Sequence, residues 1–157
     1  TIDRSQGFYD AIADAPEIKI IDSGDAEFLR EPASVLMDDY LIANEKIDAV
    51  YSHAEESAWG AALAIMRAGR SGDGIRQYTI DASNEGFRSV ESGEFAADGN
   101  YTPYIGQVGV RAALYVLSGK TLEGTETYEY GTRYTLPEMP VVTPENVADW
   151  LGTGWGE

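Results

Sequence analysis

The polar turn at residues 52–57, Ser-His-Ala-Glu-Glu-Ser, gathers side chains that could do chemistry. His53 is the single histidine of the chain and lies near Ser52 and Ser57, and a histidine that activates a serine is the centre of a nucleophilic triad. Neither serine stands in the Gly-x-Ser-x-Gly turn that exposes such a nucleophile. A partly exposed turn histidine is therefore the favoured interpretation of His53, and no residue is predicted to be catalytic.

Two adjacent carboxylates, Glu55 and Glu56, follow in the same turn and could form the acid–base pair of a glycosidase. Adjacent residues at a helix start point in different directions, and acidic residues are favoured in a first helical turn by the helix dipole. The helix-start interpretation is therefore preferred. The sequence also has no glycine-rich phosphate loop, so it predicts no nucleotide cofactor, nor any other cofactor.

Composition excludes further classes of function. Twenty-seven acidic residues against 11 basic ones give a formal net charge of −16, which repels phosphate backbones and predicts no nucleic-acid partner. The acidic residues are scattered, as on a solubilising surface. Without cysteine there is no disulfide, no thiolate chemistry and no structural zinc site, and we predict no metal. No apolar run approaches the roughly 20 residues of a membrane span.

The residues on either side of the turn at 52–57 predict the secondary structure that positions it. A strand at 47–51 precedes it and an alanine-rich helix from Ser57 to Gly69 follows, which together make half of a β-α-β unit. Similar alternation runs along the chain. The other expected strands are 18–21, 77–80, 95–99 (weak), one or two in 125–135, and 141–142, and the other expected helices are 5–15, 26–43, 85–90, 103–117 and 144–151. Residues 152–157 are expected to be a loose tail.

Alternating strands and helices predict an α/β fold, a parallel sheet with helices on both faces. The chain opens on a helix, whereas such folds normally begin with a strand that becomes central. The first strand of the sheet is therefore expected to be missing.

Polar groups recur where the predicted strands end, and ligands of open α/β sheets gather at this edge. Asp81 follows the third strand, Asn100 and Tyr101 follow the fourth, and Arg4 heads the first helix. A guanidinium and a carboxylate bind vicinal hydroxyls by charge-assisted hydrogen bonds, and aromatic rings cover the apolar face of a sugar. The set suits a neutral polyol, although Asp81 could equally be the N-cap of the helix near Asn84.

Several short motifs, taken together, carry a resemblance to a known family. They are Arg-Ser-Gln-Gly-Phe at 4–8, Ile-Asp-Ala-Val-Tyr at 47–51, Gly60-Ala61, Ile80-Asp81, Gly93, Pro-Tyr-Ile-Gly at 103–106 and the closing residues 141–147. In order and spacing, over nearly the whole chain, they resemble the ribose-binding-protein-like sugar-binding proteins. The resemblance implies the solute-binding component of a bacterial ABC importer, periplasmic or otherwise extracytoplasmic, that binds a sugar or polyol in a hinged cleft. It implies no catalysis and a membrane permease as partner.

Members of that family have two lobes, and this chain resembles only the second half. The resemblance makes residues 1–101 the C-terminal lobe, incomplete at its start, with 102–137 crossing the hinge to the N-terminal lobe and 138–157 returning as a final segment and tail. We therefore expect a fragment, whose first strand lies upstream of Thr1 together with the missing N-terminal half as a further partner.

The resemblance also implies ligand-binding residues. Arg4 and Asp81 match the family's sugar-binding arginine and aspartate, and Tyr101, with Asn100 beside it, falls where a glutamine often binds sugar. Where the family usually has Asn-Asp, this chain has Ala54 and Glu55. Alanine cannot bond a hydroxyl through its side chain, so either Glu55 or His53 takes over, or the ligand lacks that hydroxyl.

Two alternatives of other classes remain. One is the effector domain of a LacI-type transcription regulator, which shares the fold; the acidic charge and the importer-like ending argue against it. The other is a glycosidase-like hydrolase that would use Glu55 and Asp81, and that would be favoured by turnover of a chromogenic glycoside.

Overall fold

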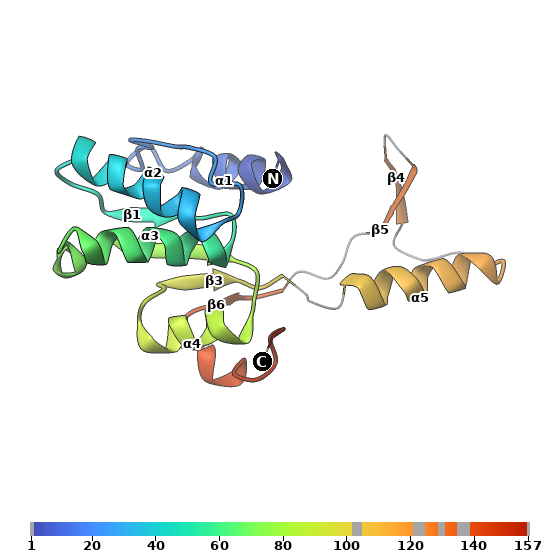
Figure 1. The fold of residues 1–157 in the computed structure, drawn as a ribbon. Helices are drawn as coiled ribbons and strands as arrows, with labels where there is room; N and C mark the ends of the chain where they lie inside the picture. Colours follow the sequence, from blue (N-terminus) through green and yellow to red (C-terminus); the bar gives the residue numbers. More distant parts are fainter. Residues whose placement is uncertain (1, 102–104, 121–124, 129–130, 135–138, 157) are drawn as a thin grey trace.

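A four-stranded sheet forms the centre of the computed structural model, which describes residues 2–101, 105–120, 125–128, 131–134 and 139–156 (Figure 1). Its strands lie in the order β1-β2-β3-β6. Their bounds are Ala49–Tyr51 for β1, Arg76–Ile80 for β2, Ala97–Gly99 for β3 and Val141–Val142 for β6. β1, β2 and β3 are parallel, so their carboxyl ends meet at one edge of the sheet.

β6 pairs antiparallel with β3, so the sheet is mixed and the prediction of a purely parallel sheet is wrong in this strand. The chain leaves the sheet after β3 and comes back to β6 from the same end of the sheet (Figure 1). A strand that enters from that end runs against β3. The side chain of Val142 is fully buried, which secures this short strand in the core.

Three helices pack side by side over one face of the sheet. They are α2 (Arg30–Ala43), α3 (Glu55–Arg67) and α4 (Asn84–Ser92) (Figure 1). Two apolar clusters hold them. One joins α2 to α3 and β1, and the other joins α3 to α4 and β6; their buried members are Met37, Ile47, Ala61, Ala64 and Ile65 in the first, and Ala58, Ala82, Phe87, Val90, Phe95, Val142 and Val147 in the second. The alanines of α3 allow its neighbours to approach closely.

The first helix, α1 (Ile2–Ile12), lies on the opposite face. Its Phe8 ring stacks on Tyr51 of β1 with ring centroids 4.6 Å apart, whereas Val50, the next residue back, packs into the α2–α3 cluster. Side chains alternate between the faces of a strand, so α1 is opposite α2. Helices on both faces are confirmed, although α1 has no buried residue.

The strand predicted at 18–21 does not form. The three isoleucines Ile18, Ile20 and Ile21 are exposed, and within the described residues β1 is the edge strand on its side of the sheet. A β-rich run becomes a strand only when it finds a neighbour to pair with. The helix predicted from residue 26 begins instead at Arg30, because Glu27 and Phe28 have φ values of 52° and 60°, outside the helical region.

The C-terminal part differs from the prediction in two ways. The helix expected at 144–151 is reduced to a 3₁₀ turn, η2 (Val147–Asp149), which follows an Asn146 side chain bonded to the backbone N–H of Thr143 at 2.8 Å. The tail is not loose where it is described. The backbone N–H of Asn84 donates to the Trp155 carbonyl at 2.9 Å, so the tail packs against the start of α4.

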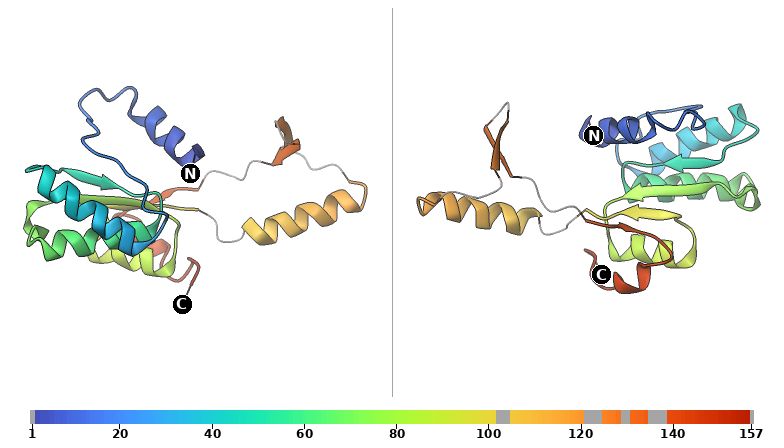
Figure 2. Two further views of the ribbon diagram at one scale, coloured as in Figure 1. Left: turned by 45° about the horizontal axis from the view of Figure 1, so that its top comes forward. Right: turned by 180° about the vertical axis from the view of Figure 1, so that it is seen from behind.

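The helix α5 (Ile105–Leu117) and the hairpin of β4 (Thr125–Tyr128) and β5 (Gly131–Tyr134) stand apart from the sheet (Figure 2). One or two strands were predicted at 125–135, and the structure has two that pair antiparallel. None of the residues of α5 is buried, and Leu117 is 82% exposed. A search of the described residues finds no helix long and apolar enough to cross a membrane. The remaining short element is the 3₁₀ turn η1 (Ser71–Asp73).

Candidate functional site

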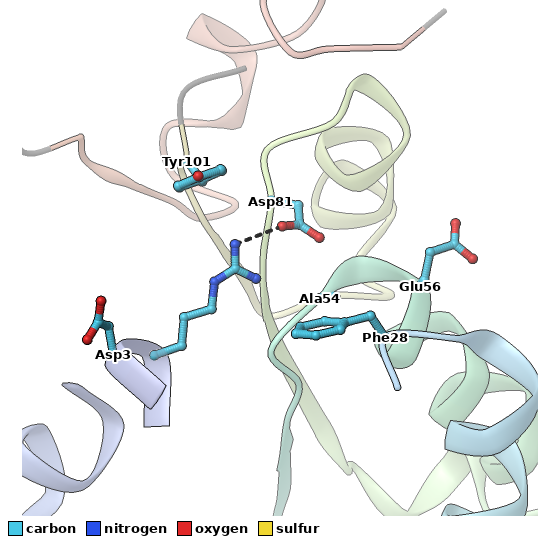
Figure 3. Close-up of a pocket in the computed structure, with 7 residues that line it drawn as sticks. Asp3, Phe28, Ala54, Glu56, Asp81 and Tyr101 are labelled. Atoms are coloured by element: carbon cyan, nitrogen blue, oxygen red, sulfur yellow. Dashed lines mark hydrogen bonds and ion pairs between the residues drawn. The ribbon is translucent and has the colours of Figure 1, made fainter. Parts of the chain in front are cut away.

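An ion pair between Arg4 of α1 and Asp81 stands at the centre of the candidate site (Figure 3). Asp81 directly follows β2, and its Oδ1 lies 3.2 Å from Nη2 of Arg4. Nη1 of Arg4 donates to the carbonyl oxygen of His53, which follows β1. One guanidinium therefore joins the ends of two adjacent strands, as expected from the shared edge of a parallel sheet.

The second oxygen of Asp81 is also held. Oδ2 accepts from the backbone N–H of Glu55, the first residue of α3, at 3.3 Å. Burial raises the pKa of Asp81 above its ordinary value, an effect that the Arg4 charge opposes. The carboxylate is thus fixed in orientation while about a fifth of the side chain stays exposed and can still accept from a ligand.

A pocket of about 590 Å³ opens in front of this pair. Arg4 lies in it with its guanidinium carbon 5.2 Å from the centre of the Tyr101 ring, a cation–π geometry. The residues that line it combine both charges with two rings: Asp3, Arg4, Phe28, Ala54, Glu56, Asp81 and Tyr101 (Figure 3). Such a lining offers donors, acceptors and flat apolar surfaces, the requirements of a neutral polyhydroxylated ligand.

His53 is not among the residues that line this pocket, and its ring packs against Tyr51 at a centroid distance of 5.2 Å. Burial, and then the positive charge of Arg4, lower the pKa of His53, so the imidazole is neutral at neutral pH. A neutral imidazole carries one donor and one acceptor. Through its backbone carbonyl, His53 positions Arg4; the direct ligand contact predicted for its side chain stays a prediction.

The two glutamates of the turn lie in different surroundings, as predicted for adjacent residues at a helix start. Glu56 is exposed and forms a two-pronged hydrogen bond with Arg30, at 2.6 and 3.1 Å. Glu55 is buried, and its Oε1 accepts from the backbone N–H of Ser83 at 2.8 Å. Glu55 is not among the residues that line the pocket. The glycosidase hypothesis requires Glu55 and Asp81 to face a substrate together. In the structure only Asp81 lines the pocket, which counts against that hypothesis.

The start of α4 settles the alternative role of Asp81. Ser83 is the N-cap of this helix, and its Oγ accepts from the backbone N–H of Gly86 at 2.8 Å. Asp81 lies two residues before the cap and faces Arg4 instead. The N-cap interpretation of Asp81 is therefore wrong, and its carboxylate is available to the pocket.

Comparison with known proteins decides the family. A model of the periplasmic binding protein domain matches residues 1–121. The chain belongs to this family. A galactofuranose-binding protein of Escherichia coli is 35% identical over 106 residues, 65% of this chain and 33% of that protein. A ribose import binding protein of Escherichia coli is 31% identical over 122 residues, 77% of this chain and 40% of that protein.

Solved structures agree with this assignment. The arabinose-transporter binding protein of Shewanella sp. ANA-3, bound to α- and β-L-arabinofuranose, superposes with a TM-score of 0.81 and 29% identity over 97% of this chain and 49% of that one. A galactofuranose binding protein gives a TM-score of 0.82 with 28% identity, over 98% and 50%. The chain thus spans about half the length of these structures, and a third to two fifths of the two relatives above.

Of the six residues predicted to bind ligand, this periplasmic binding protein domain brings Arg4, Asp81 and Tyr101 together at the pocket. His53 touches Arg4, and Glu55 is buried behind Asp81. Asn100 follows β3 half-buried and is not part of the pocket lining. Their roles toward a ligand stay predictions.

Sequence reasoning missed Phe28 and Trp155. Phe28 reaches the pocket through a left-handed backbone that no local pattern indicates. Trp155 donates from Nε1 to the Asp81 carbonyl at 2.9 Å, across 74 residues of sequence. A lone tryptophan in a tail assumed to be loose was the one available signal. Among the described residues, no cluster of three or more histidines and carboxylates could hold a metal ion.

Proposed function

We propose that this chain is part of a solute-binding protein of a bacterial ABC importer and that it binds a sugar or polyol without catalysis. The observation that carries the proposal is the pairing of Arg4, from helix α1, with Asp81, which follows β2, beside the ring of Tyr101 in a pocket large enough for a monosaccharide. The sugar-binding names of the relatives support the same class of ligand.

In this proposal Arg4 donates to one hydroxyl of the sugar while Asp81 accepts from its neighbour, and each hydrogen bond is charge-assisted. Phe28 and Tyr101 cover the C–H face of the ring. Ala54, which lines the pocket, adds only apolar surface. The proposed ligand therefore either lacks a hydroxyl at Ala54 or bonds it to His53 nearby.

The proposed protein has a second lobe. Residues 1–101 and 138–157 would belong to the lobe described above, and 102–137 would cross to the other. The exposed apolar residues of α5 support this division, because Val110, Leu114, Val116 and Leu117 all face solvent. A helix with such a surface needs a partner to cover it. Closure of the two lobes over the sugar would complete the site.

A periplasmic or otherwise extracytoplasmic location and docking to a membrane permease complete the proposal. They rest on the transporter names of the relatives. The regulator alternative is not favoured, since the relatives and structures reported above are named as sugar-binding or import proteins and none of them as a repressor.

The test is isothermal titration of the native-length protein with D-ribose, L-arabinose, D-galactose, D-fructose and xylitol. For the sugar that binds, Asp81→Asn should weaken affinity by about 10- to 150-fold, since a hydrogen bond to a charged group is worth about 1.5–3 kcal/mol. Asparagine keeps the acceptor that Arg4 uses, so the unliganded protein should stay folded.

Asp48→Asn is the matched control, because this carboxylate is 78% exposed and pairs only with Lys46 at 2.9 Å among the interactions described for it. It should leave affinity unchanged. Wild-type affinity in Asp81→Asn would remove Asp81 from the site, and no heat with any sugar of the panel would count against the proposed ligand class.

A further inference from the structure

Two carboxyl groups lie buried behind the candidate site, a costly arrangement that calls for an explanation. Glu55 of α3 is 2% exposed and Asp98 of β3 is 0% exposed. Both press against Gly86 of α4: a Cβ added there would come within 1.9 Å of Glu55 Oε1 and 2.8 Å of Asp98 Oδ2. The two carboxyls therefore meet in the same small space.

Together the two carboxyls accept hydrogen bonds from the backbone N–H groups of the turn that carries Asp81. The N–H of Asp81 donates to Oδ1 of Asp98 at 3.1 Å, and the neighbouring N–H of Ala82 lowers the pKa of this carboxyl. The next N–H, of Ser83, donates to Glu55. Ala82 has a φ of 66°, a left-handed conformation that costs a non-glycine residue free energy and persists only where its surroundings hold it. The amides on either side of Ala82, those of Asp81 and Ser83, are bound by the carboxyl pair and hold this conformation.

One oxygen of the pair has no donor from any group described. Oδ2 of Asp98 is buried without a hydrogen-bond partner, and the carboxyl it faces is that of Glu55. Two ionised carboxylates that meet at one buried place, here against Gly86, repel each other strongly. A single proton on either carboxyl removes one charge and supplies the missing donor. Consistent with this, burial, followed by the hydrogen bond to Glu55 and the charge of Glu55, raises the pKa of Asp98 to about 9.

We propose that Glu55 and Asp98 share one proton and that this carboxyl pair positions Asp81 for ligand binding. The positioning half of the inference rests on the function proposed above. The pair acts through the backbone of residues 81–83, so neither carboxyl touches the sugar. The charged groups next to it are Asp81, which accepts from the Glu55 backbone, and Arg4, which pairs with Asp81 from α1.

A shared proton makes stability depend on pH. The native state keeps the proton up to about pH 9, whereas an ordinary aspartate in the unfolded chain releases it near pH 3.8. The contribution is therefore complete below pH 3.8 and is lost as pH rises toward 9. Over that interval the unfolding equilibrium constant should rise by about tenfold per pH unit through this one proton.

Asp98→Asn is the informative variant. Its Oδ1 can accept from the same amides and its Nδ2 can donate to Glu55, so the amide replaces the protonated carboxyl and does not titrate. We expect the variant to fold and to lack this slope when urea unfolding is measured at intervals from pH 5 to pH 8. Glu55→Gln should behave alike, and the exposed Asp48→Asn should keep the wild-type slope.

The double variant Glu55→Gln with Asp98→Asn separates a shared proton from two independent sites. Both facing groups are then amides whose oxygens already accept from the backbone, so two NH₂ groups oppose each other. The double variant should be less stable than either single variant. If the double variant loses no more free energy of unfolding than the two single variants together, and that loss is small, the shared proton is overturned. The wild-type pH dependence of unfolding in Asp98→Asn would also overturn it. A labelled aspartate carboxyl that titrates near pH 9 by ¹³C NMR, and is absent from Asp98→Asn, would support it.

Affinity tests the positioning. With the sugar identified by titration, Asp98→Ala, which removes the acceptor of the Asp81 N–H, should lower affinity at least about tenfold, and Asp98→Asn should restore it. Equal affinities in a folded Asp98→Ala would overturn the positioning role. If wild-type protein binds no sugar, the proposed function fails, while the pH profiles still decide whether the proton is shared.

Discussion

Gly60→Ala is expected to destabilise the domain, although alanine is the better helix former. Gly60 lies in α3 where α2 crosses it, and a Cβ there would come within 2.2 Å of the Arg30 carbonyl oxygen and 2.8 Å of the Ala33 Cβ. The first of these atoms is backbone, so no side-chain rotation relieves the clash. The two helices would have to move apart.

The magnitude follows from two opposing effects. Glycine to alanine in a helix interior gains about 1 kcal/mol. Overpacking a close contact costs about 1–3 kcal/mol, with backbone clashes at the upper end. The net loss in the free energy of unfolding should be about 1–2 kcal/mol, a fall of roughly 2–8 °C in Tm for a protein of this size or somewhat larger.

Urea unfolding followed by circular dichroism measures the loss, and Gly7→Ala is the control. Gly7 is also in a helix, α1, but a Cβ there would meet nothing within 4 Å. That variant should be neutral or slightly stabilised. A Gly60→Ala protein as stable as Gly7→Ala would refute the close crossing of α2 and α3.

Two further predictions concern the turn after β2. Ser83→Ala removes the acceptor for the Gly86 N–H and should lower the free energy of unfolding in urea by about 0.5–2 kcal/mol. The control Ser118→Ala, at the exposed end of α5, should be nearly neutral. Equal urea midpoints for the two variants would show that Ser83 does not act as a cap. Trp155→Phe keeps an aromatic ring but loses the donor to the Asp81 carbonyl. It should weaken sugar affinity severalfold, because one hydrogen bond is worth about 0.5–1.5 kcal/mol. Unchanged affinity would show that the tail does not contribute to the site.

Local pattern was sufficient where a residue's role depends on its neighbours in the chain. The alanine-rich run after Ser57 forms α3, and the short run before the turn forms β1. Because the carboxyl ends of parallel strands meet at one edge, the position of Asp81 after a predicted strand was enough to place it beside the turn that follows β1. The role of Arg4 beside it came from the family resemblance, and the structure pairs the two side chains.

Pattern failed where the partner comes from elsewhere in the chain. The β-rich run at 18–21 has the propensity of a strand but no neighbour among the described residues, and propensity does not supply one. β6 fits the pattern of a strand, yet its direction depends on the end of the sheet from which the chain returns.

The sequence by itself determined the family, the α/β class and the chemistry available at the strand ends, because these follow from residue types and local spacing. Only the tertiary structure decided that Glu55 turns inward to Asp98, away from the pocket, and that Trp155 reaches Asp81. A carboxylate at a helix start carries the same local signal whether it faces solvent or the core. Its role depends on burial and on partners tens of residues away, and these exist only once the sheet has assembled.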